Sequence, residues 1–142
     1  ITVKNNWKKE GYTFNRMTNY CGKWIKHGLW YPDVKLRLWD STKGSWGGKN
    51  PHDTYILEQK TSQEHLNGDL LHYSIKDKED HIARVKKYCK LEKAYPNKLI
   101  AFLVAAKTFI RSFIFRRGFM AGKLGYQVSL ISAKAKWWRG RV

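Results

Sequence analysis

The residues best suited to chemistry in this chain are Asp53 and His52, which directly follow the glycine-rich run 47–51. A carboxylate on such a loop can act as a general base, removing a proton from an acceptor hydroxyl as a new bond forms. A lone His–Asp pair more often makes only local hydrogen bonds. Residue types and spacing alone leave both roles open.

His72 lies between Leu71 and Tyr73 in an otherwise apolar run. It could bind a metal or a phosphate at a strand end, although its position alone favours a half-buried structural histidine. The five histidines do not show the paired spacing of a structural zinc site. The sequence also contains no G-x-x-x-x-G-K-S/T, G-x-G-x-x-G or G-x-S-x-G motif. We therefore expect no complete nucleotide-binding motif within this chain.

Aromatic residues are concentrated in the segment 19–40, among basic side chains. This composition is suited to binding a polar, anionic or sugar-bearing ligand. Trp30 stands beside the turn-forming Tyr31 and Asp33, so we expect it to contact ligand. Trp39 belongs to an expected strand, and we expect it to lie in the core.

Short strands and glycine-rich loops must position these residues. Strands are predicted at 12–16, 34–39, 54–57 and 70–73, with turn-rich loops at 40–44 and 47–51. Ser74 and Asp77 fit a capping box for a following helix, and Pro96 should end it.

The last third of the chain predicts amphipathic helices and is strongly basic. Residues 98–142 hold ten Lys or Arg and no acidic residue, and their apolar run 99–106 is too short to cross a bilayer. We divide the chain into 1–97 and a membrane-associating tail, 98–142. The alternative is that this tail packs on the domain with solvated cations.

Composition narrows the class of partner and the compartment. The chain has 142 residues and a formal net charge of +17, which favours an anionic partner such as nucleic acid, an acidic membrane surface or a phosphorylated substrate. Its two cysteines form no C-x-x-C pair, so a reduced, cytosolic setting is expected. Because residue 1 is Ile and the first methionine is Met17, we expect the chain to be a fragment.

Five segments in order carry a resemblance to a known family. YTFNR, NYCGKWIKHG, WYPDVKLRLWD, PHD and GDLLHYS, followed by GFMAGKLGY, together span residues 12–126. This series resembles family 2 glycosyltransferases, and within them the bacterial enzymes of lipopolysaccharide core and related surface-glycan assembly. The resemblance implies an α/β fold of the GT-A type, built around a mostly parallel sheet.

The same resemblance implies that this chain is the acceptor-side, C-terminal half of such an enzyme. The nucleotide-binding half, with an acidic motif for a divalent metal (Mg or Mn), would lie upstream, so the chain alone should be inactive. Asp53 matches the catalytic base of inverting members, and His52 replaces the acidic residue that often precedes it. His72 matches a late histidine that reaches the metal or the donor diphosphate.

The resemblance places further residues around the substrates. Gly47, Gly48 and the turn formed by Trp30, Tyr31 and Asp33 would border the acceptor pocket, and Lys23 would help to bind acceptor or donor. The expected partners are a nucleotide-sugar, a glycan or glycolipid acceptor and an anionic membrane surface. The enzyme would lie peripherally on the inner face of the cytoplasmic membrane.

Two other classes of function stay open at this stage. High charge with many aromatics is also typical of a nucleic-acid-binding module. The cations are not interleaved with aromatics in one patch and no RNP1, KH or zinc-finger pattern occurs, so we expect no nucleic acid partner. A membrane-surface adaptor without catalysis is the third possibility.

Overall fold

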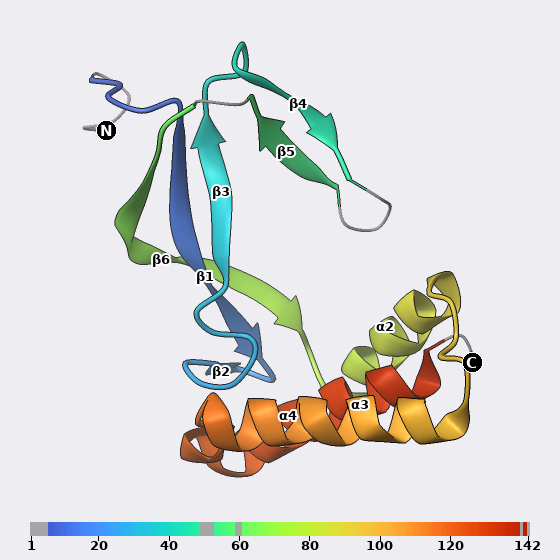
Figure 1. The fold of residues 1–142 in the computed structure, drawn as a ribbon. Coiled ribbons are helices and arrows are strands. Elements are labelled where there is room, and N and C mark those ends of the chain that lie inside the picture. The colour runs from blue at the N-terminus through green and yellow to red at the C-terminus, as the bar shows by residue number, and fades with distance from the viewer. Residues whose placement is uncertain (1–5, 49–52, 59–60, 140, 142) are drawn as a thin grey trace. The chain divides into compact units, whose positions relative to one another are not determined.

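The computed structural model describes residues 6–48, 53–58, 61–139 and 141, which form two compact units (Figure 1). Unit 1 combines the described parts of Ile1–Arg16 and Val34–Leu70. Unit 2 combines Met17–Asp33 with the described part of Leu71–Val142. Each unit is therefore assembled from two separate stretches of sequence.

A four-stranded sheet contains β1 (Gly11–Tyr20), β2 (Lys23–Trp24), β3 (Val34–Trp39) and β6 (Gln63–Ile75). In unit 1, β3 pairs antiparallel with the start of β1. In unit 2, β2 pairs antiparallel with its end, across a turn at Cys21 and Gly22 in which both residues have positive φ. β6 also pairs with β1.

A second, two-stranded sheet in unit 1 is the antiparallel hairpin of β4 (Gly44–Gly47) and β5 (Thr54–Leu57). Gly44 is required where the strands meet, because a Cβ there would collide with the carbonyl oxygen of Ile56. The sequence predicted β3 and β5 with their observed bounds, but it missed β4, whose glycines and serine read as a loop.

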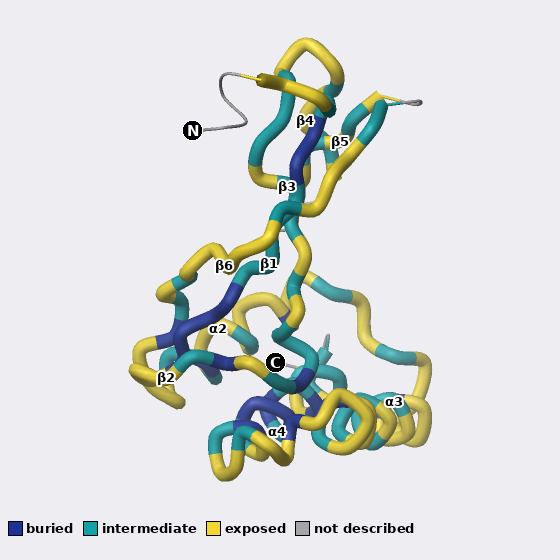
Figure 2. Tube along the Cα trace, turned by 90° about the vertical axis from the view of Figure 1, so that its left-hand side faces the viewer, coloured by how far each residue is buried: buried dark blue, intermediate teal, exposed yellow. Residues whose placement is uncertain are grey.

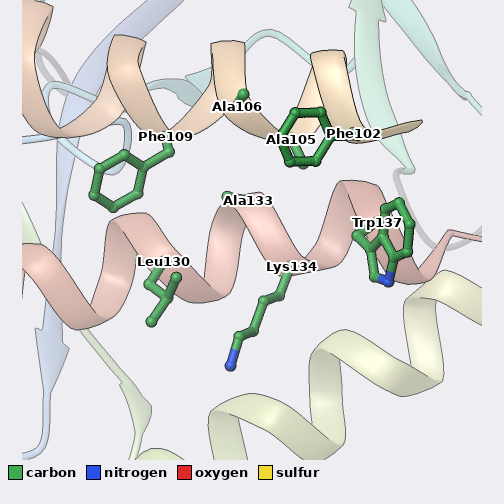
Figure 3. A pocket seen from close by; sticks show the side chains of 8 residues that line it. All are labelled: Phe102, Ala105, Ala106, Phe109, Leu130, Ala133, Lys134 and Trp137. Atoms are coloured by element: carbon green, nitrogen blue, oxygen red, sulfur yellow. The ribbon is translucent and has the colours of Figure 1, made fainter. Parts of the chain in front are cut away.

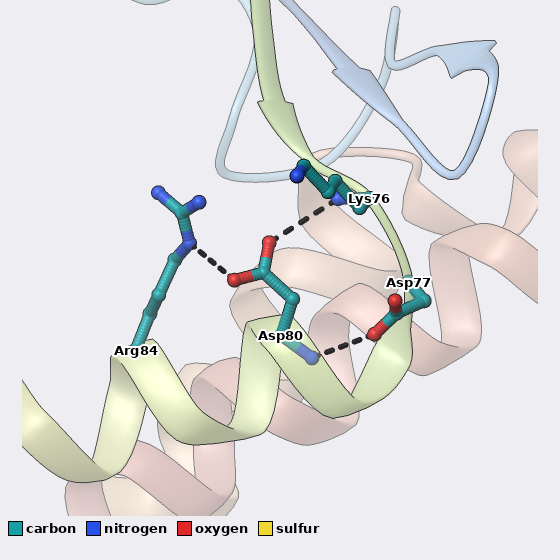
Figure 4. A network of polar contacts seen from close by, with 4 residues as sticks. All are labelled: Lys76, Asp77, Asp80 and Arg84. Carbon is teal, nitrogen blue, oxygen red and sulfur yellow. Dashed lines mark hydrogen bonds and ion pairs between the residues drawn. The ribbon is translucent and has the colours of Figure 1, made fainter.

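Helix α2 (Lys78–Leu91) begins at Asp77, whose carboxylate accepts a hydrogen bond of 2.7 Å from the backbone N–H of Asp80 (Figure 4). Asp80 in turn accepts from the backbone N–H of Lys76 and from Arg84 Nε. The prediction that Ser74 caps this helix is wrong, because β6 continues through Ile75 and holds Ser74 in extended conformation. The helix ends before Pro96, at the C-cap Glu92.

Helix α3 (Lys98–Ile110) begins at Asn97, whose side chain accepts from the N–H of Ile100. It continues into the π-helical turn η1 (Arg111–Phe115), and the 3₁₀ turn η2 (Gly118–Ala121) leads into α4 (Gly122–Trp138). Among the described residues, no helix combines the length and apolar composition needed to cross a bilayer.

Two contacts between small residues hold η1, η2 and α4 close together in unit 2. The Ser112 and Ser129 hydroxyls share a buried hydrogen bond of 2.7 Å. A Cβ on Gly125 would collide with the carbonyl oxygen of Gly118, so only glycine allows this approach. Both glycines belong to the GFMAGKLGY segment, and their spacing now has a packing reason.

The core of unit 2 joins the end of β1 to α4, and both carry buried stretches in Figure 2. Tyr20, Ile25, Ile75 and Val128 form one buried cluster. Val128 comes from the segment 98–142, so part of the predicted tail contributes to this core. The compact units thus divide the chain differently from the sequence, and the functional boundary after residue 97 stays a prediction.

The mixture of helices and strands confirms the α/β class at its coarse level. The strand pairs with a described register are antiparallel, namely β1 with β2, β1 with β3, and β4 with β5. The resemblance implies a mostly parallel sheet for a complete enzyme. The GT-A type therefore stays a prediction.

Candidate functional site

The hairpin of unit 1 carries a platform of three aromatic rings, which we call the aromatic platform: Trp39, Trp46 and Tyr55. Trp46 and Tyr55 are directly opposite each other in the β4–β5 register, which places both side chains on one face. Trp39, at the end of β3, stacks on Tyr55 with ring centroids 4.7 Å apart and an interplanar angle of 20°. Trp46 meets both rings edge-on at 5.7 Å.

The aromatic platform is anchored by a hydrogen bond of Tyr55 and is open to solvent at Trp46. The Tyr55 hydroxyl donates a 3.0 Å hydrogen bond to the carbonyl oxygen of Ser41, which holds the ring in place. Trp46 nevertheless leaves 67% of its surface exposed. The exposed Trp46 indole, packed against the two other rings, offers apolar aromatic surface of the kind that packs against the C–H face of a sugar ring.

The hairpin brings the predicted catalytic residue to this platform. Asp53 immediately precedes β5, and Gly47 pairs with Thr54, so Asp53 lies at the end of the hairpin where Trp46 also stands. The Asp53 side chain is exposed. On the other strand Gly48 follows Gly47 with φ +104°, a backbone conformation that favours glycine. His52 lies outside the described residues.

A short acidic turn sets where the hairpin begins. The Asp40 carboxylate accepts hydrogen bonds from the N–H and the hydroxyl of Thr42, at 2.9 and 2.7 Å. These bonds lower the pKa of Asp40 below its usual value. The carboxylate is ionised at neutral pH, so both hydrogen bonds from Thr42 are present and stabilise the turn between Trp39 and Gly44.

The remaining predicted site residues belong to unit 2. Lys23 is an exposed residue of β2, and Asp33 is partly buried in the loop before β3. Tyr31 forms a cis peptide bond with Pro32. Asp53, Gly47 and Gly48 belong to unit 1, so the predicted site residues are divided between the two units.

Trp30 is held against the core of unit 2. Its ring lies 5.7 Å from that of Tyr20 and 4.9 Å from the imidazole of His81, measured between centroids. It packs on the buried cluster as a partly buried side chain. Trp30 thus packs on a core, and its predicted contact with ligand stays a prediction. Trp39, expected in a core, instead stacks on Tyr55 in the exposed platform.

His81 and Tyr20 form a buried polar pair beside Trp30. His81 Nδ1 and the Tyr20 hydroxyl are 3.1 Å apart, and both side chains are almost fully buried. Burial lowers the pKa of His81 from 6.5 to about 4 and raises that of Tyr20 to about 12. Both groups are therefore neutral at pH 7, which suits a structural hydrogen bond.

The described residues do not form a metal site by themselves. His72 lies in β6 and is partly buried. Within the described ranges, no three His, Cys, Asp or Glu side chains come together as a metal-binding group. A single histidine does not fit a divalent cation by itself, and the Mg or Mn of the complete enzyme stays a prediction.

Comparison of the chain with protein-family models, curated proteins and solved structures finds no match. The functional assignment of the site therefore depends on the geometry of its residues alone. Sequence reasoning missed Tyr55 and the role of Trp46. The signal that could have found them is the hairpin register, which places one aromatic residue on each strand directly across from the other.

Proposed function

We propose that this chain is the acceptor-side part of an inverting glycosyltransferase of family 2, acting in lipopolysaccharide or surface-glycan synthesis. The observation that carries the proposal is the β4–β5 hairpin, which holds the exposed Asp53 and the Gly47–Gly48 turn at the end of the aromatic platform. An exposed carboxylate beside a fixed aromatic surface is the arrangement required to hold a sugar and deprotonate its hydroxyl.

In the proposed reaction the acceptor sugar lies on Trp46, with one hydroxyl directed to Asp53. The carboxylate takes the hydroxyl proton as the acceptor oxygen attacks the anomeric carbon of the donor. The bond from that carbon to the diphosphate breaks on the opposite face, and the nucleoside diphosphate leaves with the bonding electrons. Attack and departure on opposite faces invert the configuration.

The proposal includes partners that the chain alone does not supply. The donor nucleotide-sugar and its divalent metal would be bound mainly by an upstream half, with His72 as this chain's contribution. The acceptor would be a glycolipid at the inner face of the cytoplasmic membrane. Ten basic residues and no acidic one in 98–142 support a negatively charged surface as the place of action.

The test is Asp53→Asn in the complete enzyme, with donor and acceptor identified by screening nucleotide-sugars for release of nucleoside diphosphate. Turnover should fall at least about a hundredfold, because the amide cannot accept the proton. Far-UV circular dichroism should not change, since Asp53 is exposed. Glu64→Gln is the matched control, an exposed carboxylate on β6 of the same unit. Near-normal turnover of Asp53→Asn would exclude it as the base.

A further inference from the structure

One face of the continuous helix α3–η1 is apolar and open to solvent. Leu99, Leu103, Ile110 and Ile114 recur at the spacing of a single helix face, and Leu99 and Leu103 are 66% and 56% exposed. Phe102 and Phe115, on the same continuous helix, are exposed as well. We call the four side chains Leu99, Leu103, Ile110 and Ile114 the apolar face. Contiguous exposed surfaces of this kind mark a site of association.

An open groove of about 290 Å³ lies between α3 and α4, next to the apolar face (Figure 3). On α3 its wall is formed by Phe102, Ala106 and Phe109, and on α4 by Leu130, Ala133 and Trp137. The alanines leave the space that larger residues would fill. Lys134 is the charged residue that lines it. The groove has the chemistry for a hydrocarbon chain with a negatively charged group near its mouth.

Cations surround these apolar surfaces. Lys98, Lys107, Arg111, Arg116 and Arg117 are all exposed on or next to α3–η1. From residue 93 to the end of the sequence, no acidic side chain occurs to neutralise them. Long basic side chains can extend from a helix buried at the bilayer interface to the lipid phosphates.

We propose that the apolar face and the groove are a binding surface for acidic phospholipid. In this arrangement α3–η1 lies in the plane of an anionic leaflet, and the groove takes one acyl chain. The basic side chains around this surface favour a lipid leaflet over a protein partner. A protein partner would need an acidic rim around an apolar centre, whereas an anionic leaflet has phosphates above hydrocarbon over its whole area. The proposal concerns lipid binding, and it does not depend on sugar transfer.

The test is flotation of the full-length protein with vesicles of phosphatidylcholine, with and without 30 mol% phosphatidylglycerol. The double variant Leu103→Lys/Ile114→Lys adds positive charge but removes two inserted side chains. It should bind phosphatidylglycerol vesicles at least about tenfold more weakly, because each apolar side chain gains more from burial than one cation gains at the surface. Leu91→Lys, an exposed leucine on α2, is the matched control and should bind as the wild type does.

The groove is tested separately with phosphatidylglycerol whose acyl chains carry bromine, which quenches nearby tryptophan. Quenching of Trp137 is obtained by difference from Trp137→Phe. Ala106→Phe fills the groove and should abolish that quenching while flotation persists. Unchanged quenching in Ala106→Phe would overturn the acyl-chain site.

Either of two results would overturn the proposal that this surface binds an anionic membrane. One is unweakened binding by the Leu103→Lys/Ile114→Lys variant whose circular dichroism matches wild type. The other is equal binding to vesicles without phosphatidylglycerol. Sugar transfer to a soluble acceptor should be the same in all these variants, so failure of the lipid proposal and failure of the transferase proposal are distinguishable.

Discussion

The buried pair of His81 and Tyr20 should make this protein lose stability in mildly acidic solution. Folding buries the neutral imidazole, so the pKa of His81 is about 4 in the folded state against 6.5 in an ordinary setting. Between these values the unfolded chain binds a proton that the folded chain does not. The contribution of His81 to stability is therefore complete above pH 6.5 and is lost as the pH falls to about 4.

The expected magnitude follows from the two pKa values. A pKa lowered by about 2.5 is worth about 3 kcal/mol in the free energy of unfolding, and about 2 kcal/mol of this should be lost by pH 5. The hydrogen-bonded carboxylates Glu10, Asp40 and Asp80 also have lowered pKa values. Their contributions fall away mainly below their ordinary pKa values of about 4, so these carboxylates contribute little to the change between pH 6.5 and 5.

The assay is urea unfolding of the full-length protein at pH 7, 6 and 5, with His81→Gln as the comparison. Glutamine can bond the Tyr20 hydroxyl, but it does not titrate. The wild type should lose about 2 kcal/mol between pH 7 and 5, and the variant should lose far less. An NMR titration of the His81 ring provides the pKa directly. Equal losses in both proteins, or a ring that titrates above pH 6, would refute this reasoning.

Two further substitutions test the packing of unit 2 and the aromatic platform. Gly125→Ala should lower the free energy of unfolding by about 1–3 kcal/mol, because its Cβ would collide with the Gly118 carbonyl. Ser132→Ala on the same helix is the control, and thermal melts measure both variants. Equal melting midpoints for the two variants would contradict the packing argument. Trp46→Ala should reduce kcat/KM for the acceptor about threefold to tenfold with little change in stability, since the ring is exposed and Tyr55 keeps its bond to Ser41. An unchanged kcat/KM would show that the acceptor does not use the platform.

Local patterns predicted the regular elements of this fold well. Short strand-like runs between turn-rich loops identified β3 and β5 with their observed bounds, and the helical pattern identified the helices after residue 74. β4 and the start of β6 were missed because their residues, rich in glycine and charge, are typical of loops. They form strands because neighbouring strands supply their hydrogen bonds, which is tertiary information.

The candidate site was predictable only in part. The position of Asp53 after a glycine-rich turn pointed to a loop carboxylate, and the structure places it beside the Gly47 pairing. The platform was missed because its rings come from three strands, and their meeting depends on hairpin register. The packing of Trp30 was also not predicted: its turn-like neighbours pointed to a loop, and within that loop its ring packs on His81. No local pattern reports that kind of partner.

The buried cluster of Tyr20, Ile25, Ile75 and Val128 has a consequence for biosynthesis. The ribosome makes Tyr20 about a hundred residues before Val128, a delay on the order of ten seconds at ordinary elongation rates. During that interval the nascent chain exposes the apolar side chains that will later meet α4. Contacts between such distant residues also slow folding. We therefore expect ribosome-associated chaperones to bind the segment 17–75 during translation.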